Sequence, residues 1–275
     1  MLKTRILTAL ALLAVLLPVL YWQSLTAFGI VSGIFLACAM WECMRLFARS
    51  QGIPAAIIGS LGFAACLTVE ITGWPLFALC MLSWSLGFVP MLKFGLPRLK
   101  TRWDRLVSVL YMISIFSCFL AMVELFRHSA MYLLSVLMLV WVADSGAYFV
   151  GRSIGRRKLA PSISPGKSWE GAIGGWICVL LLASVSLSFP ALQDTFAVRV
   201  YQQLGVIGGA ATMSLIVFAS VVGDLVESQL KRRAGLKDSS QLLPGHGGVL
   251  DRIDALVPVL PLAALISVVI TSVSF

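Results

Sequence analysis

The chain has 275 residues, of which 59% are hydrophobic and only 12% are charged, and its mean hydropathy is +0.96. A soluble globule of this composition would have too little polar surface to cover its core, so that class is excluded. The formal net charge is +9, but the basic residues stand on short segments between apolar runs without a recognisable nucleic-acid-binding module, which argues against a nucleic-acid partner.

Apolar runs predict an all-α, polytopic integral membrane protein, because about 30 Å of hydrocarbon takes roughly 20 helical residues to cross. We expect nine spans, near 6–22, 26–44, 53–73, 75–92, 106–126, 129–150, 171–190, 204–223 and 255–273. Lys3 and Arg5 precede the first run as in a secretory signal, but no convincing small-residue cleavage site follows, so we expect a retained helix. We treat 1–275 as a single membrane domain, with N-terminal helices in 1–126 and catalytic helices and cytoplasmic loops in 127–275.

The basic residues predict which loops face the cytoplasm, because Lys and Arg collect on that side. All but two of the 21 basic residues fall at the N-terminus or in the loops after the second, fourth, sixth and eighth spans, and the exceptions are Arg127 and Arg199. This pattern predicts a cytoplasmic N-terminus and an external C-terminus. We therefore expect an integral protein of a bacterial inner (cytoplasmic) membrane, with its active site facing the cytoplasm.

Acidic residues inside the spans indicate polar surroundings, since a carboxylate at mid-bilayer costs roughly 2.5 to 3.5 kcal/mol. Glu70 and Glu124 stand near the outer ends of their runs, where a structural role is expected. Asp144 lies within the run LMLVWVADSGAYFVG, and for it we expect a functional role. At the end of the eighth span, helical spacing predicts a polar stripe that lines a cavity and consists of Asp224, Glu227, Ser228 and Lys231.

The loop after the sixth span contains Gly166-Lys167-Ser168, which is similar to the end of a Walker A loop. Pro161 stands where the first glycine of that motif belongs, and no βαβ context exists, so we reject a P-loop. The segment instead predicts a proline-restrained turn whose lysine and backbone amides can bind phosphate, with Glu170 at the start of the next helix.

The most informative segment is 228–254, SQLKRRAGLKDSSQLLPGHGGVLDRID, which stands between two apolar runs. It combines cations and carboxylates with His246, which lies in a Pro-Gly-His-Gly-Gly turn. Phosphates need cations around them and Mg²⁺ needs hard oxygen ligands, so this combination suits a phosphate-bearing substrate with a divalent metal.

The segment 228–254 resembles the long C-terminal signature of the phosphatidate cytidylyltransferases, also called CDP-diacylglycerol synthases. Residues 144–175 resemble a second region shared by that family, and the two motifs cover about a quarter of the chain. The N-terminal spans resemble the family only in length and hydrophobicity. The signature positions that match are Ser228, Leu230, Lys231, Arg232, Lys237, Asp238, Ser240, Leu243, Pro244, His246, Gly247, Gly248, Val249, Asp251, Arg252, Ile253 and Asp254.

The resemblance implies the conversion of CTP and phosphatidate to CDP-diacylglycerol and pyrophosphate, a reaction of phospholipid biosynthesis. The anionic phosphate of the lipid attacks the α-phosphorus of CTP. Such a nucleophile is already ionised, so positioning and charge neutralisation carry most of the catalysis. The resemblance also implies a homodimer in the lipid bilayer.

For this reaction we expect Mg²⁺ as the cofactor, with a second cation left open, and the ligands Asp224, Asp251 and, third, Asp144. The candidate catalytic residues are Asp224, Asp251, Lys237, Asp238 and His246. The candidate substrate-binding residues are Asp144, Lys167, Ser168, Ser228, Lys231, Arg232 and Arg252. Which cation meets which phosphate stays open, and His246 either donates to pyrophosphate or holds its turn. Arg233 lies outside the matched positions, so we expect it only to orient the chain.

Two other classes of protein stay open. A transporter of anionic substrates also combines basic loops with intramembrane acids, but its polar sites should recur in two halves, whereas those of this chain concentrate after residue 144. A related membrane enzyme, such as a lipid-alcohol kinase or a cytidylyltransferase for another lipid phosphate, is the second alternative. A kinase would release a nucleoside diphosphate in place of pyrophosphate.

Overall fold

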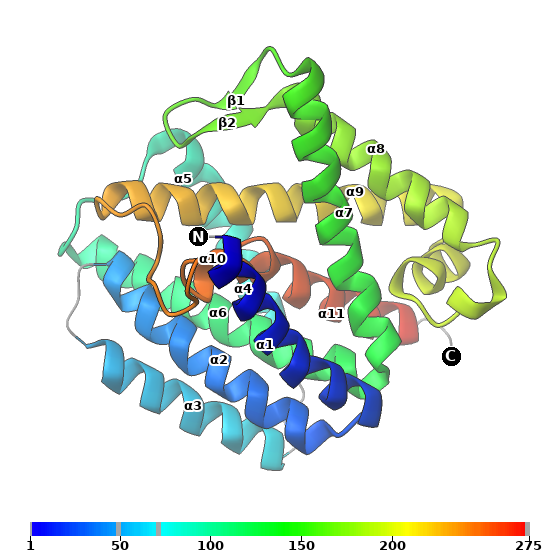
Figure 1. The fold of residues 1–275 in the computed structure, drawn as a ribbon, viewed down its shortest axis with the longest axis horizontal. Helices are drawn as coiled ribbons and strands as arrows, with labels where there is room; N and C mark the ends of the chain where they lie inside the picture. Colours follow the sequence, from blue (N-terminus) through cyan, green and yellow to red (C-terminus); the bar gives the residue numbers. More distant parts are fainter. Residues whose placement is uncertain (1, 48–50, 70–72, 273–275) are drawn as a thin grey trace.

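The computed structural model describes residues 2–47, 51–69 and 73–272, and Figure 1 shows their arrangement. Helices dominate because each apolar run satisfies its own backbone N–H and C=O groups, as hydrocarbon surroundings require. Glu70 lies outside the described residues. The elements in chain order are α1 (Leu2–Trp22), α2 (Leu25–Leu46), α3 (Gly52–Val69), α4 (Trp74–Ser83), the π-helix η1 (Trp84–Phe88), α5 (Val89–Phe94), α6 (Arg102–His128), α7 (Ala130–Ile154), β1 (Lys158–Ala160), β2 (Ser164–Ser168), α8 (Trp169–Ser186), the 3₁₀ turn η2 (Pro190–Leu192), α9 (Phe196–Arg233), α10 (Leu250–Ile253) and α11 (Leu256–Ser272).

The predicted all-α polytopic membrane fold is confirmed, and each predicted span overlaps helical residues. Among the described residues, seven helical segments are long and apolar enough to cross a membrane, while the apolar helices Leu13–Trp22 and Leu256–Thr271 are shorter. The count of nine spans and the cytoplasmic N-terminus stay predictions.

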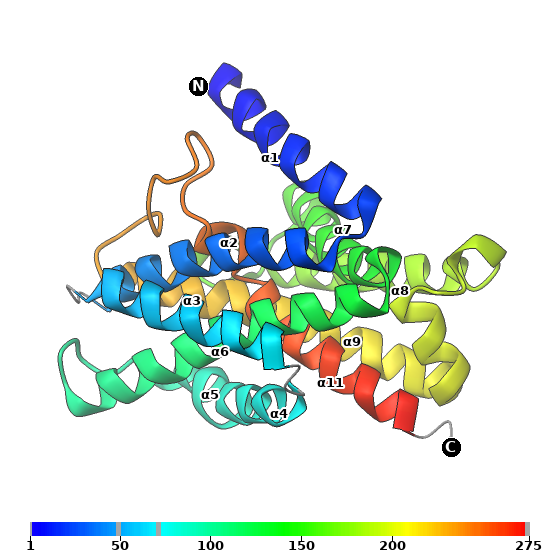
Figure 2. The same cartoon turned by 90° about the horizontal axis from the view of Figure 1, so that it is seen from below.

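Two loops that the sequence assigns to the cytoplasmic side lie at the same end of the molecule. In Figure 1 these loops, 95–101 and 234–249, are at the left edge and the β1–β2 hairpin is at the top, whereas the loop 187–195 and the end of α11 lie at the right. Figure 2 shows α1 standing away from the other helices. Thr8 of α1 nevertheless reaches the 234–249 loop, where its hydroxyl donates to the Pro244 carbonyl at 2.9 Å.

One glycine and a long helical tail shape α9. The helix bends at Gly205, whose φ of 69° is accessible to glycine at little steric cost. Beyond the bend the helix continues to Arg233, well past the predicted end of the span at residue 223. The polar residues between Asp224 and Lys231 therefore stand on a continuous helix, whose spacing fixes their mutual positions.

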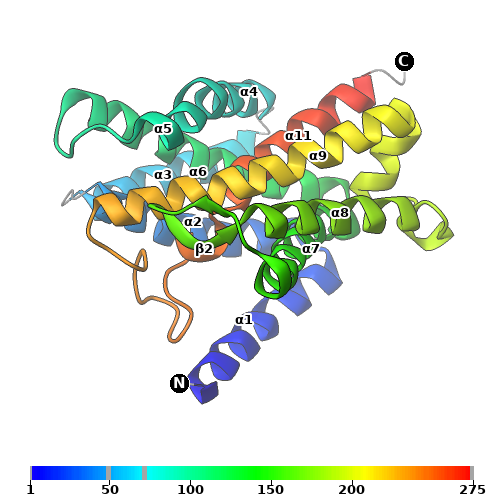
Figure 3. The same cartoon turned by 90° about the horizontal axis from the view of Figure 1, so that it is seen from above.

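The segment between α7 and α8 forms a small hairpin where the sequence predicts only a turn. Its strands pair antiparallel, with Lys158 opposite Ser168 and Ala160 opposite Ser164. The Glu170 carboxylate accepts hydrogen bonds from the backbone amides of Arg156 and Arg157 at 3.1 and 3.2 Å, which ties the start of the hairpin to the start of α8. In Figure 3 the hairpin lies beside α9, which β2 contacts.

Helices α7 and α8 approach each other closely because small residues face each other between them. A Cβ atom at Gly175 would overlap the Ala143 carbonyl oxygen, and one at Gly171 would lie 2.7 Å from the Ala147 carbonyl oxygen. This backbone approach holds α8 against the turn of α7 that carries Asp144.

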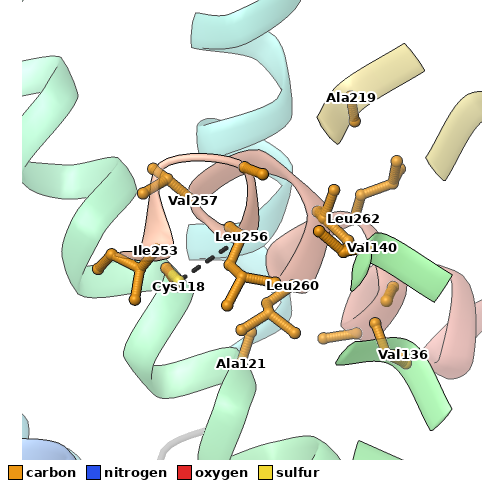
Figure 4. Close-up of a cluster of buried hydrophobic side chains, with 14 of the residues drawn as sticks. Cys118, Ala121, Val136, Val140, Ala219, Ile253, Leu256, Val257, Leu260 and Leu262 are labelled. Atoms are coloured by element: carbon orange, nitrogen blue, oxygen red, sulfur yellow. Dashed lines mark hydrogen bonds between the residues drawn. The ribbon is translucent and has the colours of Figure 1, made fainter. Parts of the chain in front are cut away.

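An apolar core fixes the start of α11, as Figure 4 shows. Side chains from α6, α7, α9, α10 and α11 meet there, and Val257 and Leu260 are completely buried. The Cys118 thiol of α6 donates to the Leu256 carbonyl at 3.5 Å. This packing determines where α10 ends, and therefore where Asp251 stands relative to α9.

Candidate active site

The four polar residues predicted to form a stripe on α9 contact one another along one face of the helix, and the cavity that they are expected to line stays a prediction. The Ser228 hydroxyl donates to Asp224 Oδ1 at 3.2 Å. One turn further on, the Lys231 ammonium pairs with Glu227, whose side chain is completely buried. Residues four apart on a helix face the same side, so this stripe is built by local geometry alone.

Lys231 joins the stripe to the 234–249 loop and α10, because its Nζ atom also lies 2.7 Å from Asp251 Oδ1. The other oxygen of Asp251 accepts from the Ser239 amide at 2.9 Å, the Ser239 hydroxyl at 2.9 Å and the Gly248 amide at 2.8 Å. Burial opposes ionisation of Asp251, but Lys231 and these amides outweigh it and hold the pKa of the carboxyl below its usual range. Asp251 is therefore a fixed anion.

The β1–β2 hairpin brings a second lysine to the stripe. Lys167 Nζ, on β2, lies 2.5 Å from Asp224 Oδ2, and both side chains are partly exposed. Asp144 of α7 interacts electrostatically with both of these residues. Lys167 is thus linked to Asp144 and Asp224, while Lys231, also on the end of α9, is linked to Glu227 and Asp251.

Asp254, at the junction of α10 and α11, completes the group. Burial, followed by the negative charge of Asp224, raises the pKa of Asp254 to about 7, against smaller opposing effects that include Lys231 and Lys167. We name the group the carboxylate cluster, and its members are Asp144, Asp224, Glu227, Asp251, Asp254, Lys167 and Lys231.

The carboxylate cluster contains five carboxyl groups and two ammonium groups, so formal negative charge is in excess. Hard carboxylate oxygens are the donors that Mg²⁺ prefers, and Mg²⁺ is commonly held by only one or two of them together with substrate phosphates. Within the described ranges, no three His, Cys, Asp or Glu side chains converge closely enough to form a complete metal site. The donor chemistry therefore fits Mg²⁺, with ligands from the substrate.

The other predicted site residues lie around this cluster. Ser168 is buried, and its hydroxyl accepts from the Gly171 amide at 3.2 Å as the cap of α8. Arg252 donates through Nε to the His246 carbonyl at 3.0 Å, while the His246 Nδ1 atom is buried without a hydrogen-bond partner. The exposed side chains are those of Arg232, Lys237, Asp238 and Arg252. Their predicted roles stay predictions.

Arg233, for which the sequence predicts only an orienting role, is largely buried. Its guanidinium lies 2.9 Å from Asp104 Oδ1, donates to the Pro97 carbonyl at 2.9 Å and stacks over the Phe47 ring at 4.8 Å. These contacts anchor the end of α9 to the start of α6 and to the loop before it. The members of the carboxylate cluster that lie on α9 are therefore held on a fixed helix end.

Sequence reasoning missed Glu42 of α2, which is completely buried and contacts the 234–249 loop. It lies near the end of the second apolar run, in AMWECMRLF. The criterion that singled out Asp144, an acid inside an apolar run, applies equally to Glu42 and would have found it.

Comparisons with known proteins extend the likeness to nearly the whole chain. The cytidylyltransferase family model matches residues 3–270. A phosphatidate cytidylyltransferase of Haemophilus influenzae is 37% identical over 286 aligned residues, which cover 95% of this chain and 96% of the relative. One from Pseudomonas aeruginosa is 38% identical over 270 residues, 96% of each chain, and one from Staphylococcus aureus is 33% identical over 265 residues, 94% of this chain and 96% of the relative. The N-terminal helices are included in these matches.

Proposed function

Since the chain belongs to the cytidylyltransferase family, we propose that it converts CTP and phosphatidate to CDP-diacylglycerol and pyrophosphate in phospholipid biosynthesis. The observation that carries the proposal is a set of contacts that joins its two motifs through Asp224 of α9. Asp224 pairs with Lys167 of the first motif and accepts a hydrogen bond from Ser228 of the second, in which Lys231 pairs with Asp251. Two separate segments thus supply cations to one acidic site.

The reaction depends more on neutralising the charge of the phosphate groups than on a strong general base. A phosphate oxygen of phosphatidate forms a bond to the α-phosphorus of CTP, and the bond between that phosphorus and the oxygen bridging to the β-phosphorus breaks, releasing pyrophosphate. In the proposal, Lys167 and Lys231, which pair with Asp224 and Asp251 in the structure, neutralise phosphate oxygens during this exchange. The exposed Arg232, Lys237 and Arg252 are further phosphate-binding groups in the proposal.

Mg²⁺ is part of the proposal, held by Asp224 and Asp251 with Asp144 nearby. When bound, it supplies charge neutralisation for the triphosphate and the leaving pyrophosphate. The excess of carboxyl groups in the carboxylate cluster and its hard oxygen donors support this assignment. Lys231 and the loop amides hold Asp251 in one orientation, so this carboxylate is preorganised.

The proposed location is the inner membrane with the carboxylate cluster on the cytoplasmic side, where CTP is found, and the proposed assembly is a homodimer. The distribution of basic residues supports the orientation, and the family resemblance alone supports the dimer.

Cysteines introduced near Arg157 and Lys237, in a background without the native cysteines, should be protected from an impermeant thiol reagent in intact cells. Cysteines near Ser129 and Thr195 should react, and the reverse pattern would overturn the orientation. Cross-linking in native membranes tests the dimer, and a monomer alone would overturn it.

The reaction is tested with purified protein in mixed micelles that contain phosphatidate, Mg²⁺ and α-labelled CTP. Label should enter an organic-extractable liponucleotide while an equal amount of pyrophosphate appears, and a chelator should abolish both. Diacylglycerol should not replace phosphatidate, because it lacks the attacking phosphate oxygen.

The same assay separates the alternative functions. γ-labelled CTP should leave the lipid unlabelled, whereas a lipid kinase would transfer the terminal phosphate. Movement of phosphatidate across a bilayer without nucleotide chemistry would replace the proposal with a transporter.

A further inference from the structure

Glu42 stands on α2, far from the two motifs in sequence, yet it contacts the signature segment through both carboxylate oxygens. Oε1 accepts from the Ser240 hydroxyl and, at 3.0 Å, from the Val249 amide. Oε2 accepts from the Leu250 amide at 2.6 Å and lies 3.1 Å from the Ser239 hydroxyl, whose single proton also faces Asp251. A buried carboxylate is costly unless it is hydrogen-bonded, and these contacts offset that cost.

These donors immediately surround Asp251. Val249 and Leu250 are the two residues before it, and Ser239 is the residue whose amide and hydroxyl both contact its Oδ2 atom. Glu42 therefore holds both sides of the loop that presents Asp251 to Lys231. The hydroxyl of Ser239 lies between the two carboxylates, at 3.1 Å from Glu42 and 2.9 Å from Asp251.

Gly248 is an independent sign that this contact shapes the loop. A Cβ atom at this position would overlap both the Ser239 hydroxyl and the Glu42 carboxylate. The last glycine of the Pro-Gly-His-Gly-Gly turn is thus required by close approach of the loop to Glu42, and its amide donates to Asp251.

We propose that Glu42 is a positioning residue for the transferase reaction: it acts through the 239–251 loop to hold Asp251 in its working orientation. The inference rests on the proposed function, and it adds a residue of the N-terminal helices to a site otherwise built from residues after 143. A glutamine retains the size of the side chain but presents an NH₂ group to donors that need an acceptor, so Glu42→Gln should loosen the loop without creating a cavity.

The test measures steady-state kinetics of purified Glu42→Gln in the phosphatidate assay. We expect kcat to fall by roughly 10- to 100-fold, with much smaller changes in KM for CTP. That range is typical when a residue that orients a metal-binding side chain is replaced. Glu124→Gln is the matched control, because Glu124 lies on α6 beside His128, away from the loop, and should leave kcat unchanged. Glu42→Asp should restore part of the activity, since it retains an acceptor for each donor pair.

A double-mutant cycle distinguishes positioning from a general effect on the fold. If Glu42 acts through Asp251, Glu42→Gln should have little further effect on kcat in an Asp251→Asn background. Independent, multiplying effects would overturn the proposal. If Glu42→Gln does not fold, Ser239→Ala replaces it in the same cycle, because it removes the hydroxyl between the two carboxylates.

Hydrogen exchange supplies a measurement that does not depend on turnover. The amides of Gly248, Val249 and Leu250 should exchange faster in Glu42→Gln than in wild type or Glu124→Gln. Unchanged exchange, or full activity of Glu42→Gln, would overturn the positioning role while wild-type activity still supports the proposed function. An inactive wild type would overturn the proposed function, and exchange would then decide whether Glu42 holds the loop.

Discussion

Two polar clusters lie near opposite ends of α9, and they differ in how their charges are balanced. At the start of the helix, Asp194 accepts from the Ser129 hydroxyl at 2.8 Å, contacts His128 Nε2 at 2.8 Å and pairs with Arg199 at 3.2 Å. We name these four residues the distal cluster. Here one carboxylate has three polar partners, whereas in the carboxylate cluster five carboxyl groups share two lysines.

The difference is consistent with a structural role for the distal cluster and with the proposed catalytic role of the carboxylate cluster. Burial opposes ionisation of Asp194, but its hydrogen bonds from His128 and Ser129 outweigh this effect and lower the pKa of the carboxyl. The distal cluster therefore satisfies its own charge and closes the α6–α7 turn against α9. The carboxylate cluster has an excess of acidic groups over basic ones, which supports the proposal that it binds a cation together with substrate phosphates.

The largest expected effect comes from neutralising one acid in the carboxylate cluster. Asp224→Asn and Asp251→Asn should each reduce turnover by at least about two orders of magnitude, because charge that develops on the phosphoryl groups loses its electrostatic stabilisation. Activity is measured on protein that elutes as a folded species in detergent.

The matched control is Asp194→Asn in the distal cluster, which makes the same chemical change. It should lower the thermal midpoint slightly and leave kcat unchanged. Near-normal activity of Asp224→Asn or Asp251→Asn at moderate Mg²⁺ would remove that residue from the metal site, and a large loss in Asp194→Asn would erase the distinction between the clusters.

A smaller effect should separate the two lysines. Lys231 is mostly buried between Glu227 and Asp251, so Lys231→Met leaves buried carboxylates unpaired and should cost about 3–5 kcal/mol of stability as well as activity. Lys167 is more exposed and pairs only with Asp224 among the ion pairs of the described residues. Lys167→Met should therefore raise KM for CTP or phosphatidate with little change in the thermal midpoint. Equal thermal losses in the two variants would contradict this division.

Local spacing explains what the sequence could predict about the site. Asp224, Ser228 and Lys231 follow one helix face, so their contacts can be read from positions alone. The ion pair between Lys231 and Asp251 joins two residues across the 234–249 loop, and it was not predicted from the sequence. The apolar runs predicted the helices because each span is defined by length and hydropathy.

Long-range and irregular features escaped prediction for physical reasons. The Glu42 contacts join residues about 200 positions apart, for example Ser240 at a separation of 198, and no local pattern encodes them. The β1–β2 hairpin has only three and five residues in its strands, too few for an alternating pattern. The Arg233–Asp104 ion pair was also missed, because the sequence does not reveal that both side chains become buried.

Mn²⁺ binding tests most directly the proposal that the excess carboxyl groups of the carboxylate cluster hold a divalent cation. Electron paramagnetic resonance would follow Mn²⁺ bound to purified protein in the presence of CTP and absence of phosphatidate. Wild type and Asp194→Asn should immobilise Mn²⁺ with the same affinity, Mg²⁺ should displace it, and Asp224→Asn and Asp251→Asn should each weaken binding at least about tenfold. Equal Mn²⁺ binding by all four proteins, beyond that of CTP alone, would contradict the assignment of the cation to this cluster.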